Sequence, residues 1–337
     1  MPTVLPTPRV DQTRSMQLVL GVDGGESSTA ARVVDATTGA VVGEAETGVG
    51  CRDDGTAAPG DEATLAAVAT AVGDAVRSAG TDRSRLAVSV LALAAARWPA
   101  DVDRLREPLA ALDLGADLQI CNDSFAVLRA GIERPWGLVS IVGSGAVTAG
   151  RNRTGTTSRS LGMGWGEPDG ARSVVDDALH AVAAAHSGVG PDTALTTMFC
   201  SASDLDGPDA LFESIERGGR AFGPDWCPEV FRTARADDHV AIGIVEDHAR
   251  RHAALTVALG RRLGLHVYDT DVVLAGGLHL TDDRRWASTF AAHIHLGIPA
   301  ARLARLDRPP VAGAVDLAID ALAVRGTSGQ RVIRGLR

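Results

Sequence analysis

The chain has no lysine, so all 33 of its lysine-or-arginine positions are arginines. A Walker-type phosphate loop needs a lysine, and so does the active site of a protein kinase. Both classes of phosphate site are therefore excluded. Any phosphate chemistry in this protein has to rely on backbone amides, hydroxyl groups, a metal ion and arginine.

Basic residues are also in the minority. Acidic residues outnumber them by 42 to 33, the net charge is −9, and no basic cluster stands out along the chain. A nucleic-acid partner requires a basic surface that neutralises phosphates. The composition therefore argues against nucleic acid as the main partner.

Cysteines and long apolar runs are scarce. The four cysteines lie far apart and form no CxxC pair, which argues against a zinc site or a disulfide framework and favours reduced thiols in a cytosol. No stretch of about twenty apolar residues occurs, and segment 1–16, expected to be a flexible extension, lacks the apolar core of a signal peptide. We therefore predict a cytoplasmic protein without a membrane partner.

Apolar residues, in contrast, are plentiful. They make up 45% of the 337 residues, whereas charged residues make up 22%. This composition is typical of a globular chain, and the length exceeds what one hydrophobic core usually serves. We therefore expect two lobes.

The first lobe opens with three predicted strands, at residues 17–23, 29–34 and 40–47. Tight turns join them, and Gly24-Gly25 forms the first turn. Such a succession predicts an antiparallel meander and not the strand-turn-helix of a dinucleotide fold. The glycine-rich turn then lies between two strands.

An α/β alternation follows this meander. The pattern predicts a helix at 61–79, a strand at 86–93, a helix at 100–112 and a strand at 117–121. Asn122-Asp123-Ser124 comes directly after the last of these strands and opens another helix. Asp123 is thereby placed at the carboxyl end of a strand, where open α/β sheets gather their ligands.

The second half echoes the first. After the break at Pro135-Trp136-Gly137, a strand at 138–142 leads into the turn Gly143-Ser144-Gly145 and a further strand at 146–149. Later predicted elements are a mainly helical region at 170–263, a long helix at 238–263, a strand at 271–274 that runs into Gly276-Gly277, a closing helix at 313–324 and a flexible tail at 325–337. Two related lobes that meet at a cleft account for this pattern.

The first glycine turn has the composition of a phosphate site. Its candidate ligands are Asp23, Gly24, Gly25, Ser27, Ser28 and Thr29. Glycines let backbone amides approach a phosphate closely, hydroxyls donate to its oxygens, and a carboxylate at a strand end can hold a hydrated magnesium ion. An ordinary hairpin turn is the alternative, because Asp-Gly and Gly-Gly are standard turn sequences.

Two more turns repeat this chemistry. Gly143-Ser144-Gly145 offers amides and a hydroxyl, and Gly276-Gly277 allows a helix to begin close to a nucleotide base or ribose. Each turn alone is explained as a hairpin or a strand-to-helix connection. Three of them at the ends of predicted strands, with Asp123 between the first two, favour a nucleotide site.

These motifs resemble those of the sugar kinases in the actin, heat-shock chaperone and hexokinase superfamily, and in particular the N-acetylglucosamine kinase and BadF-type ATPase branch. The resemblance spans residues 17–324. It implies an α/β, two-lobed actin-like ATPase (ribonuclease H-like) fold with a central nucleotide cleft, and ATP and Mg²⁺ as cofactors. The implied lobes are 17–134 and 135–312, with the helix at 313–324 packed back on the first lobe.

The resemblance also implies roles for individual residues. The turn from Asp23 to Thr29 binds the terminal phosphates of ATP, and Asp23 organises magnesium. Gly143-Ser144-Gly145 is similar to the second phosphate turn, and Gly276-Gly277 to the adenosine motif. Asp123 is then the general base that accepts a proton from a sugar hydroxyl. A helix N-cap is its alternative role, and the two are compatible.

The chain departs from this family where the acceptor is chosen. The family loop with a sugar-binding asparagine reads Gly48-Val49-Gly50-Cys51-Arg52 here, and the Gly-Trp-Gly loop, Gly164–Ala171, is shorter than usual. Arg52 is a candidate for an anionic group or a surface ion pair. The candidate substrate residues are Asn122, Asp123, Gly164, Trp165, Glu167 and Asp169. For Glu167 and Asp169, a solvent-exposed loop with a capping aspartate is the alternative.

The predicted function is an ATP-dependent sugar kinase that phosphorylates a hydroxyl, by family expectation the 6-hydroxyl, of an amino sugar such as N-acetylglucosamine or glucosamine. Another sugar or an aminocyclitol is an alternative acceptor. An ATPase activator of a reductive dehydratase is a second alternative, although the scattered cysteines count against its iron–sulfur cluster. A non-catalytic sugar sensor is a third, and it would not need Asp123. The family implies a homodimer.

Overall fold

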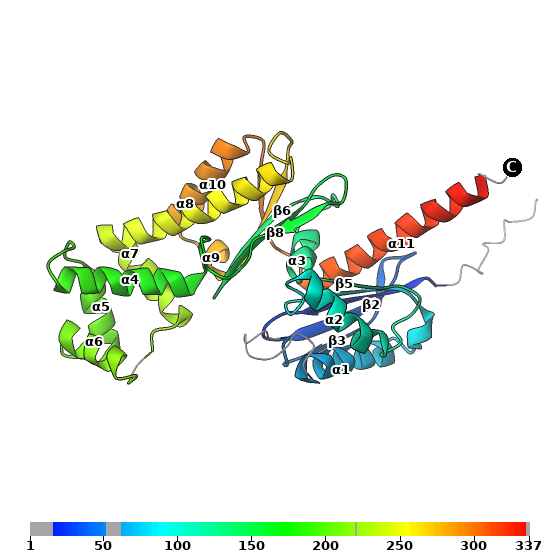
Figure 1. Ribbon diagram of the computed structural model, residues 1–337, viewed down its shortest axis with the longest axis horizontal. Helices are drawn as coiled ribbons and strands as arrows, with labels where there is room; N and C mark the ends of the chain where they lie inside the picture. The colour runs from blue at the N-terminus through cyan, green and yellow to red at the C-terminus, as the bar shows by residue number, and fades with distance from the viewer. Residues whose placement is uncertain (1–15, 52–61, 220, 335–337) are drawn as a thin grey trace, which may run out of the picture. The chain divides into compact units, whose positions relative to one another are not determined.

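The computed structural model describes residues 16–51, 62–219 and 221–334, without the side chains of 326–334. The chain divides into two compact units. Unit 1 comprises the residues up to Asp123 together with those from Ala314 onward, and unit 2 comprises Ser124–Gly313. The expected boundary at 134/135 is therefore wrong by one helix, because α3 belongs to unit 2. Figure 1 shows the course of the chain.

Unit 1 contains a five-stranded sheet in the order β3-β2-β1-β4-β5. Its strands are β1 (Leu18–Gly24), β2 (Thr29–Asp35), β3 (Ala40–Thr47), β4 (Leu86–Leu93) and β5 (Leu118–Cys121). The first three form the predicted antiparallel meander, and β4 and β5 run parallel to β1. The carboxyl ends of β1, β4 and β5 thus share one edge of the sheet.

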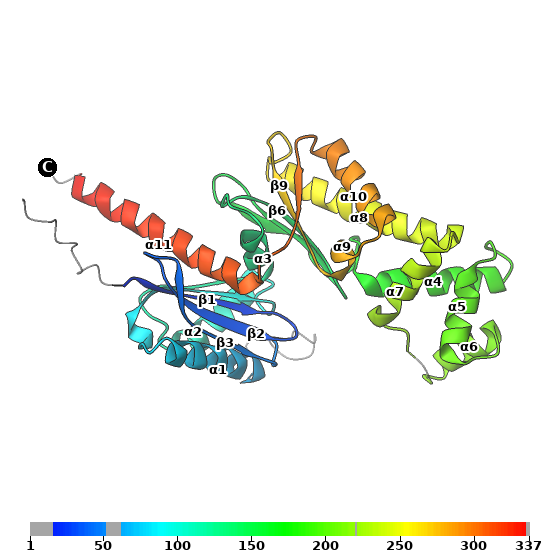
Figure 2. The same ribbon diagram turned by 180° about the vertical axis from the view of Figure 1, so that it is seen from behind.

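Helices cover both faces of this sheet, as Figures 1 and 2 show. They are α1 (Glu62–Ser78), the 3-10 turn η1 (Arg83–Arg85), α2 (Pro99–Ala110) and α11 (Pro310–Arg334). Alternate residues of β1 serve the two faces: Leu18 and Leu20 pack in the core with α1 and α2, whereas Val19 packs with Val315 of α11. The period-2 alternation of a buried strand explains this division.

Unit 2 repeats the arrangement with a sheet in the order β10-β9-β6-β7-β8. Its strands are β6 (Gly137–Val142), β7 (Ala146–Arg151), β8 (Thr157–Arg159), β9 (Asp271–Ala275) and β10 (Arg302–Arg305). Strands β6, β7 and β8 form an antiparallel meander, and β9 and β10 are parallel to β6. The predicted echo between the halves is therefore present strand by strand.

The helices of unit 2 lie partly on the sheet and partly beyond it. They are α3 (Ser124–Ala130), α4 (Ala171–His186), α5 (Ala194–Ser203), α6 (Pro208–Glu216), η2 (Pro224–Trp226), α7 (Cys227–Arg235), α8 (His239–Arg262), α9 (Gly277–Leu280) and α10 (Arg284–Gly297). Figure 2 shows α8 and α10 running side by side, and their apolar faces share the largest core of the unit. A smaller core holds α3 against β6, β7 and β9.

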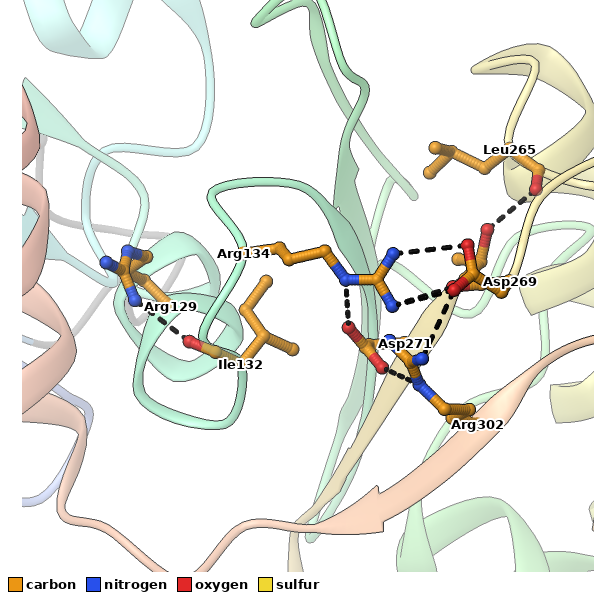
Figure 3. A network of polar contacts seen from close by, with 8 residues as sticks. Arg129, Ile132, Arg134, Leu265, Asp269, Asp271 and Arg302 are labelled. Atoms are coloured by element: carbon orange, nitrogen blue, oxygen red, sulfur yellow. Dashed lines mark hydrogen bonds and ion pairs between the residues drawn. The ribbon is translucent and has the colours of Figure 1, made fainter.

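An ion-pair network connects the amino ends of strands β6, β9 and β10 in unit 2 (Figure 3). The Arg134 guanidinium donates to both carboxylate oxygens of Asp269 at 3.2 Å and lies 3.3 Å from an Asp271 oxygen. Arg302 reaches the same two aspartates, at 3.2 Å and 2.7 Å. The Arg134 guanidinium carbon also lies 4.5 Å from the centroid of the Trp136 ring. This network therefore lies at the sheet end opposite to the glycine turns.

Two sequence predictions of extent need correction. The closing helix does not end at 324, since α11 continues to Arg334 and replaces most of the expected flexible tail 325–337. Strands β8 and β10 and helix α10 are absent from the prediction; the two strands are only three and four residues long. No helix among the described residues is long and apolar enough to span a membrane.

Candidate functional site

In unit 1, backbone hydrogen bonds connect the first glycine turn to the candidate base. The amide of Ala94, just after β4, donates to the carbonyl of Gly24 at 2.8 Å. The amide of Asp123, just after β5, donates to the carbonyl of Leu93 at 3.3 Å. Asp123 and the turn are therefore neighbours at the carboxyl edge of the sheet, as the sequence predicts.

Asp23 has small side chains beside it on both neighbouring strands of the sheet. The strand register sets it beside Ala30 of β2 and Ala92 of β4, both with small side chains. Two residues earlier on the same face, Gly21 has no room for a Cβ because the backbone of α11 at Val315 crosses there. The Asp23 carboxylate thus lies just beyond the point where α11 crosses the sheet.

Three carboxylates share this edge. Glu46 of β3 is in register with Ala30, and so falls in the same row as Asp23. Burial, followed by the negative charges of Asp123 and Glu46, raises the pKa of Asp23 from its ordinary 3.8 to about 7. Such a site has a deficit of positive charge. Sequence reasoning missed Glu46, and only the strand register reveals it.

The hairpin itself is a four-residue turn closed by the Gly25 amide, which donates to the Ser28 carbonyl at 3.0 Å. Ser27 is exposed and Ser28 half-buried. Thr29 differs, because it is fully buried and its hydroxyl donates to the Val49 carbonyl at 2.9 Å. The Thr29 hydroxyl is therefore engaged inside the hairpin.

The loop after β3 supports this hairpin. The Cys51 amide donates to the Gly25 carbonyl at 2.8 Å, and the Cys51 sulfur fills the space that a Cβ on Gly24 would need. Gly50 is likewise required, since a Cβ there would meet the Glu26 carbonyl. The loop thus fixes the turn. Arg52, the candidate for an anionic group, lies outside the described residues.

Asn122 is the second predicted residue whose polar group is engaged. Its side chain is buried, and the amide donates to the Leu93 carbonyl at a long 3.5 Å. The same carbonyl accepts the Asp123 amide, so Asn122 fixes the backbone that carries the candidate base. Asp123 itself is half-buried at the start of α3.

In unit 2, the turn Gly143-Ser144-Gly145 is exposed at the carboxyl end of β6. The Gly143 amide donates to the Gly145 carbonyl at 2.9 Å, and the first amide of α4, at Ala171, donates to the Gly143 carbonyl at 2.8 Å. Gly170 lies so close to these carbonyls that it has no room for a Cβ. The positive end of α4 thus faces the turn, an arrangement that favours anions.

The predicted adenosine-side turn packs directly on the predicted phosphate turn. Gly276 has φ 85° and ψ 157°, a conformation reserved for glycine, and a Cβ on it would meet the backbone of Val142 and Gly143. Gly277, in contrast, is exposed with open space around it. The two glycine turns of unit 2 are therefore in contact, as a continuous nucleotide site requires.

A cavity of about 680 Å³ opens between these turns and α7. Its lining is Gly143, Ser144, Ala171, Pro224, Asp225, Cys227, Pro228, Phe231, Arg235, Gly277, Leu278, Leu280 and Thr281. Its volume is in the range of small-molecule and cofactor sites. The residues from η2 and α7 escaped sequence reasoning, because no glycine motif marks them.

The Gly-Trp-Gly loop is held by its own acidic residues. The two carboxylate oxygens of Glu167 accept the amides of Leu161 and Gly162 at 2.8 Å and 2.9 Å. Trp165 is 76% exposed, and Gly164 adopts φ 70°. Glu167 therefore shapes the loop and presents the indole to solvent.

Asp169 is the acidic residue of this loop that lies at the phosphate turn. A Cβ placed on Gly145 would be 3.5 Å from its Oδ1 atom, and one placed on Gly164 would be 3.5 Å from its Oδ2 atom. Its Oδ1 also accepts the Gly170 amide at 2.8 Å. Asp169 thus connects the candidate acceptor loop with the second phosphate turn.

Metal-binding side chains are sparse. Within the described parts of the chain, no three His, Cys, Asp or Glu side chains are grouped so that they could hold a metal ion. None of the four cysteines, all of them among the described residues, forms a disulfide, and burial raises the pKa of the Cys227 thiol to about 12. Magnesium differs from zinc in this respect, because it keeps several waters and needs only one or two carboxylates beside substrate phosphates. Asp23 meets that requirement.

Solved structures with the same architecture are available. A candidate N-acetylglucosamine kinase from Chromobacterium violaceum has a TM-score of 0.60 at 19% identity, over 90% of this chain and 99% of that one. A ROK hexokinase from Thermus thermophilus has a TM-score of 0.55 at 20% identity, over 92% and 100%. A ROK family glucokinase from Streptomyces griseus, in complex with glucose and AMPPNP, has a TM-score of 0.51 at 18% identity, over 89% and 99%.

No protein-family model and no curated protein matches the chain. The likeness is therefore one of structure at low identity. Both units carry the same strand order, and the likeness extends over nearly the full length of the first two of these structures. The chain has the actin-like ATPase fold.

Proposed function

We propose that this protein is an ATP-dependent sugar kinase. The observation that carries the proposal is the cavity of unit 2, in which the turn at Gly143–Ser144 and the turn at Gly277 meet around about 680 Å³. A phosphate turn and a roomy, largely apolar pocket in contact with each other suit a nucleoside with its phosphates. The glucokinase of the same fold was solved with a nucleotide analogue and a sugar, which supports the pairing.

The donor's phosphates would be held by backbone groups. Ser144 and Gly145 are exposed, and the amino end of α4 stands behind them. In unit 1, the other candidate phosphate turn follows Gly24: the Gly25 amide closes it, and the hydroxyls of Ser27 and Ser28 would donate to the phosphates. With no lysine in the chain, these dipoles and a cation supply the positive potential.

The cation would be Mg²⁺, held by Asp23. The donor set fits, because the partly buried carboxylate with a pKa of about 7 and two acidic neighbours gains from a nearby positive charge. When bound, magnesium would neutralise the charge of the phosphates. The protein's own contribution is the fixed position of Asp23 beyond the α11 crossing.

Asp123 would act as the general base. A sugar hydroxyl is a poor nucleophile, and a carboxylate within hydrogen-bond reach accepts its proton as the oxygen attacks the γ-phosphorus. The new bond joins the sugar oxygen to phosphorus, and the bond from phosphorus to the β-γ bridging oxygen breaks to release ADP. The hydrogen bond from the Asp123 amide to the Leu93 carbonyl holds the base in place during this step.

The acceptor is proposed to be an amino sugar, phosphorylated at its 6-hydroxyl. Asp169 and Trp165 of unit 2 are the acceptor residues that we favour, since Asp169 lies at the second phosphate turn and Trp165 exposes an aromatic face. Glu167 holds the loop through backbone amides, and Asn122 holds the base. A cytoplasmic location, predicted from composition, and a homodimer, implied by the resemblance, stay predictions.

The experiment is an ADP-release screen with purified protein, Mg²⁺ and ATP over glucosamine, N-acetylglucosamine, glucose, N-acetylmuramic acid and aminocyclitols. We expect one amino sugar to release ADP together with an equal amount of a phosphorylated product. A protein that binds ADP but phosphorylates none of the panel would contradict the acceptor class. Acceptor-independent ATP hydrolysis by a protein that carries bound iron would instead support a dehydratase activator.

A further inference from the structure

Three histidines are buried in the core of unit 2, and none of them belongs to the proposed reaction. His252 is 1% exposed, His279 is 3% exposed and His248 is fully buried. Burial lowers the pKa of both His252 and His279 from 6.5 to about 3, so both rings are neutral at physiological pH. A buried neutral imidazole carries one donor and one acceptor, and its partners show which nitrogen is which.

His279 connects the adenosine-side turn to the strand of the phosphate turn. It lies in α9, two residues after Gly277. The Trp286 indole Nε1 can only donate, and it lies 3.3 Å from His279 Nδ1, so this nitrogen is the acceptor. The proton is therefore on Nε2, which donates to the Ser140 hydroxyl of β6 at 2.9 Å.

His252 makes the corresponding connection on the other side of the phosphate turn. Its Nε2 lies 3.0 Å from the carbonyl oxygen of Asp169, which can only accept. Asp169 precedes Gly170, the residue packed against the carbonyls of Gly143 and Gly145. His252 in α8 thereby holds the backbone of Asp169–Gly170, which supports this turn just before α4 begins.

Both imidazoles lie against the same tryptophan. The ring centroids of His252 and His279 are 5.8 Å and 5.7 Å from that of Trp286, which is 1% exposed. Trp286 also lies 5.9 Å from Phe231, a residue of the cavity lining. The three side chains form one buried cluster directly behind the cavity.

We propose that His279 and His252 are positioning residues for the nucleotide: they fix Gly276–Gly277 and Asp169–Gly170 on the two sides of the Gly143–Gly145 turn. The inference rests on the proposed function, because it assigns the nucleotide to this turn. Neither residue touches the ligand. Sites of this kind depend on side chains that lock the surrounding backbone, since a small displacement of backbone donors weakens binding strongly.

His248 provides a matched control. It lies one turn before His252 on α8, it is equally buried, and its Nε2 forms a hydrogen bond of 2.8 Å with Asp177 near the surface of α4. Among the described residues, neither of its ring nitrogens forms a hydrogen bond to a glycine turn. Replacing it removes a buried imidazole and its hydrogen bond without altering the support of the phosphate turn.

The test measures the affinity for ADP with Mg²⁺ by titration calorimetry, and the melting temperature of each variant. We expect His279→Leu and His252→Leu to weaken ADP binding about tenfold or more, and His279→Gln and His252→Gln, which keep an amide donor, to recover most of it. His248→Leu lowers the melting temperature by a comparable amount and leaves the affinity for ADP unchanged.

Several outcomes would overturn the inference. Wild-type affinity in His279→Leu and His252→Leu would do so, and so would an equal loss of affinity in His248→Leu. Should the leucine variants fail to fold, Ser140→Ala, which keeps the imidazole and removes only its acceptor, decides the question: unchanged ADP binding sinks the role of His279. A wild-type protein that binds no ADP would refute the proposed function itself, and the inference with it.

Discussion

Replacing Asp23 with asparagine should stabilise the metal-free protein at high pH, although the residue belongs to the proposed active site. The native state raises the pKa of Asp23 from 3.8 to about 7 through burial and the charges of Asp123 and Glu46. Between these two pH values, the native state keeps a proton that the unfolded chain has lost. The contribution of Asp23 to stability therefore falls as the pH rises from 3.8 to about 7.

The size of the effect follows from the same values. Each unit of pKa corresponds to about 1.4 kcal/mol, so raising the pH from 5 to 8 should cost the wild type about 2.6 kcal/mol at this residue. Asp23 keeps part of its exposure, and solvent screening reduces this to about 2 kcal/mol. Asp23→Asn has no such dependence, because the amide does not ionise.

Urea denaturation in EDTA at pH 5 and pH 8 measures the difference. We expect the free energy of unfolding of Asp23→Asn, relative to that of the wild type, to rise by about 2 kcal/mol between the two pH values. Glu46→Gln should produce a smaller rise, and Asp103→Asn on the exposed side of α2 should produce none. Added Mg²⁺ should stabilise the wild type more than the variant. A gap independent of pH would refute the raised pKa.

Two further predictions concern unit 2. Gly276→Ala should lower the free energy of unfolding by roughly 2–4 kcal/mol and weaken ADP binding, whereas Gly277→Ala should be tolerated. The reason is that only Gly276 combines φ 85° with contact to the Val142 backbone. Urea denaturation and calorimetry of the two variants check this, and equal effects would contradict it. Arg134→Ala should lower the melting temperature, since it removes the ion pairs with Asp269 and Asp271 and the contact with Trp136. The difference in melting temperature from the wild type should shrink in about 1 M NaCl. A difference that salt does not change would argue against ion pairing.

Sequence reasoning predicts the fold well because the strong elements are local signals. The strands at 40–47 and 86–93 have the predicted bounds, since their turns and apolar runs are explicit in the sequence. The short strand β8 has no such run, and its place is set by pairing with β7. The extent of α11 beyond 324 was missed because glycine and polar residues interrupt its apolar pattern.

The candidate site is predictable in part for a different reason. Glycine turns and Asp123 follow predicted strands, and strand ends gather ligands by topology. Whether a side chain points to a ligand or to the backbone depends on tertiary contacts. Thr29 and Asn122 of unit 1 and Glu167 of unit 2 are predicted site residues. Their polar atoms nevertheless hold Val49, Leu93 and the loop amides of Leu161 and Gly162, respectively.

Some residues that line the cavity could not be predicted from the sequence, for the same reason. Asp225 of η2 and Phe231 and Arg235 of α7 reach the lining only because η2 and α7 pack beside the glycine turns, which no local pattern encodes. The histidine cluster is similar. His252 and His279 are far apart in the chain and meet at Trp286 only in the folded core.

The central claim is that Asp123 removes a proton from a sugar hydroxyl during phosphoryl transfer from ATP. The most direct measurement compares wild type, Asp123→Asn and the surface control Asp103→Asn by following phosphosugar formation with ³¹P NMR and ADP affinity by calorimetry. The account predicts that Asp123→Asn loses at least about 100-fold in the rate of transfer and keeps its affinity for ADP, while Asp103→Asn matches the wild type. Wild-type transfer by Asp123→Asn would contradict it.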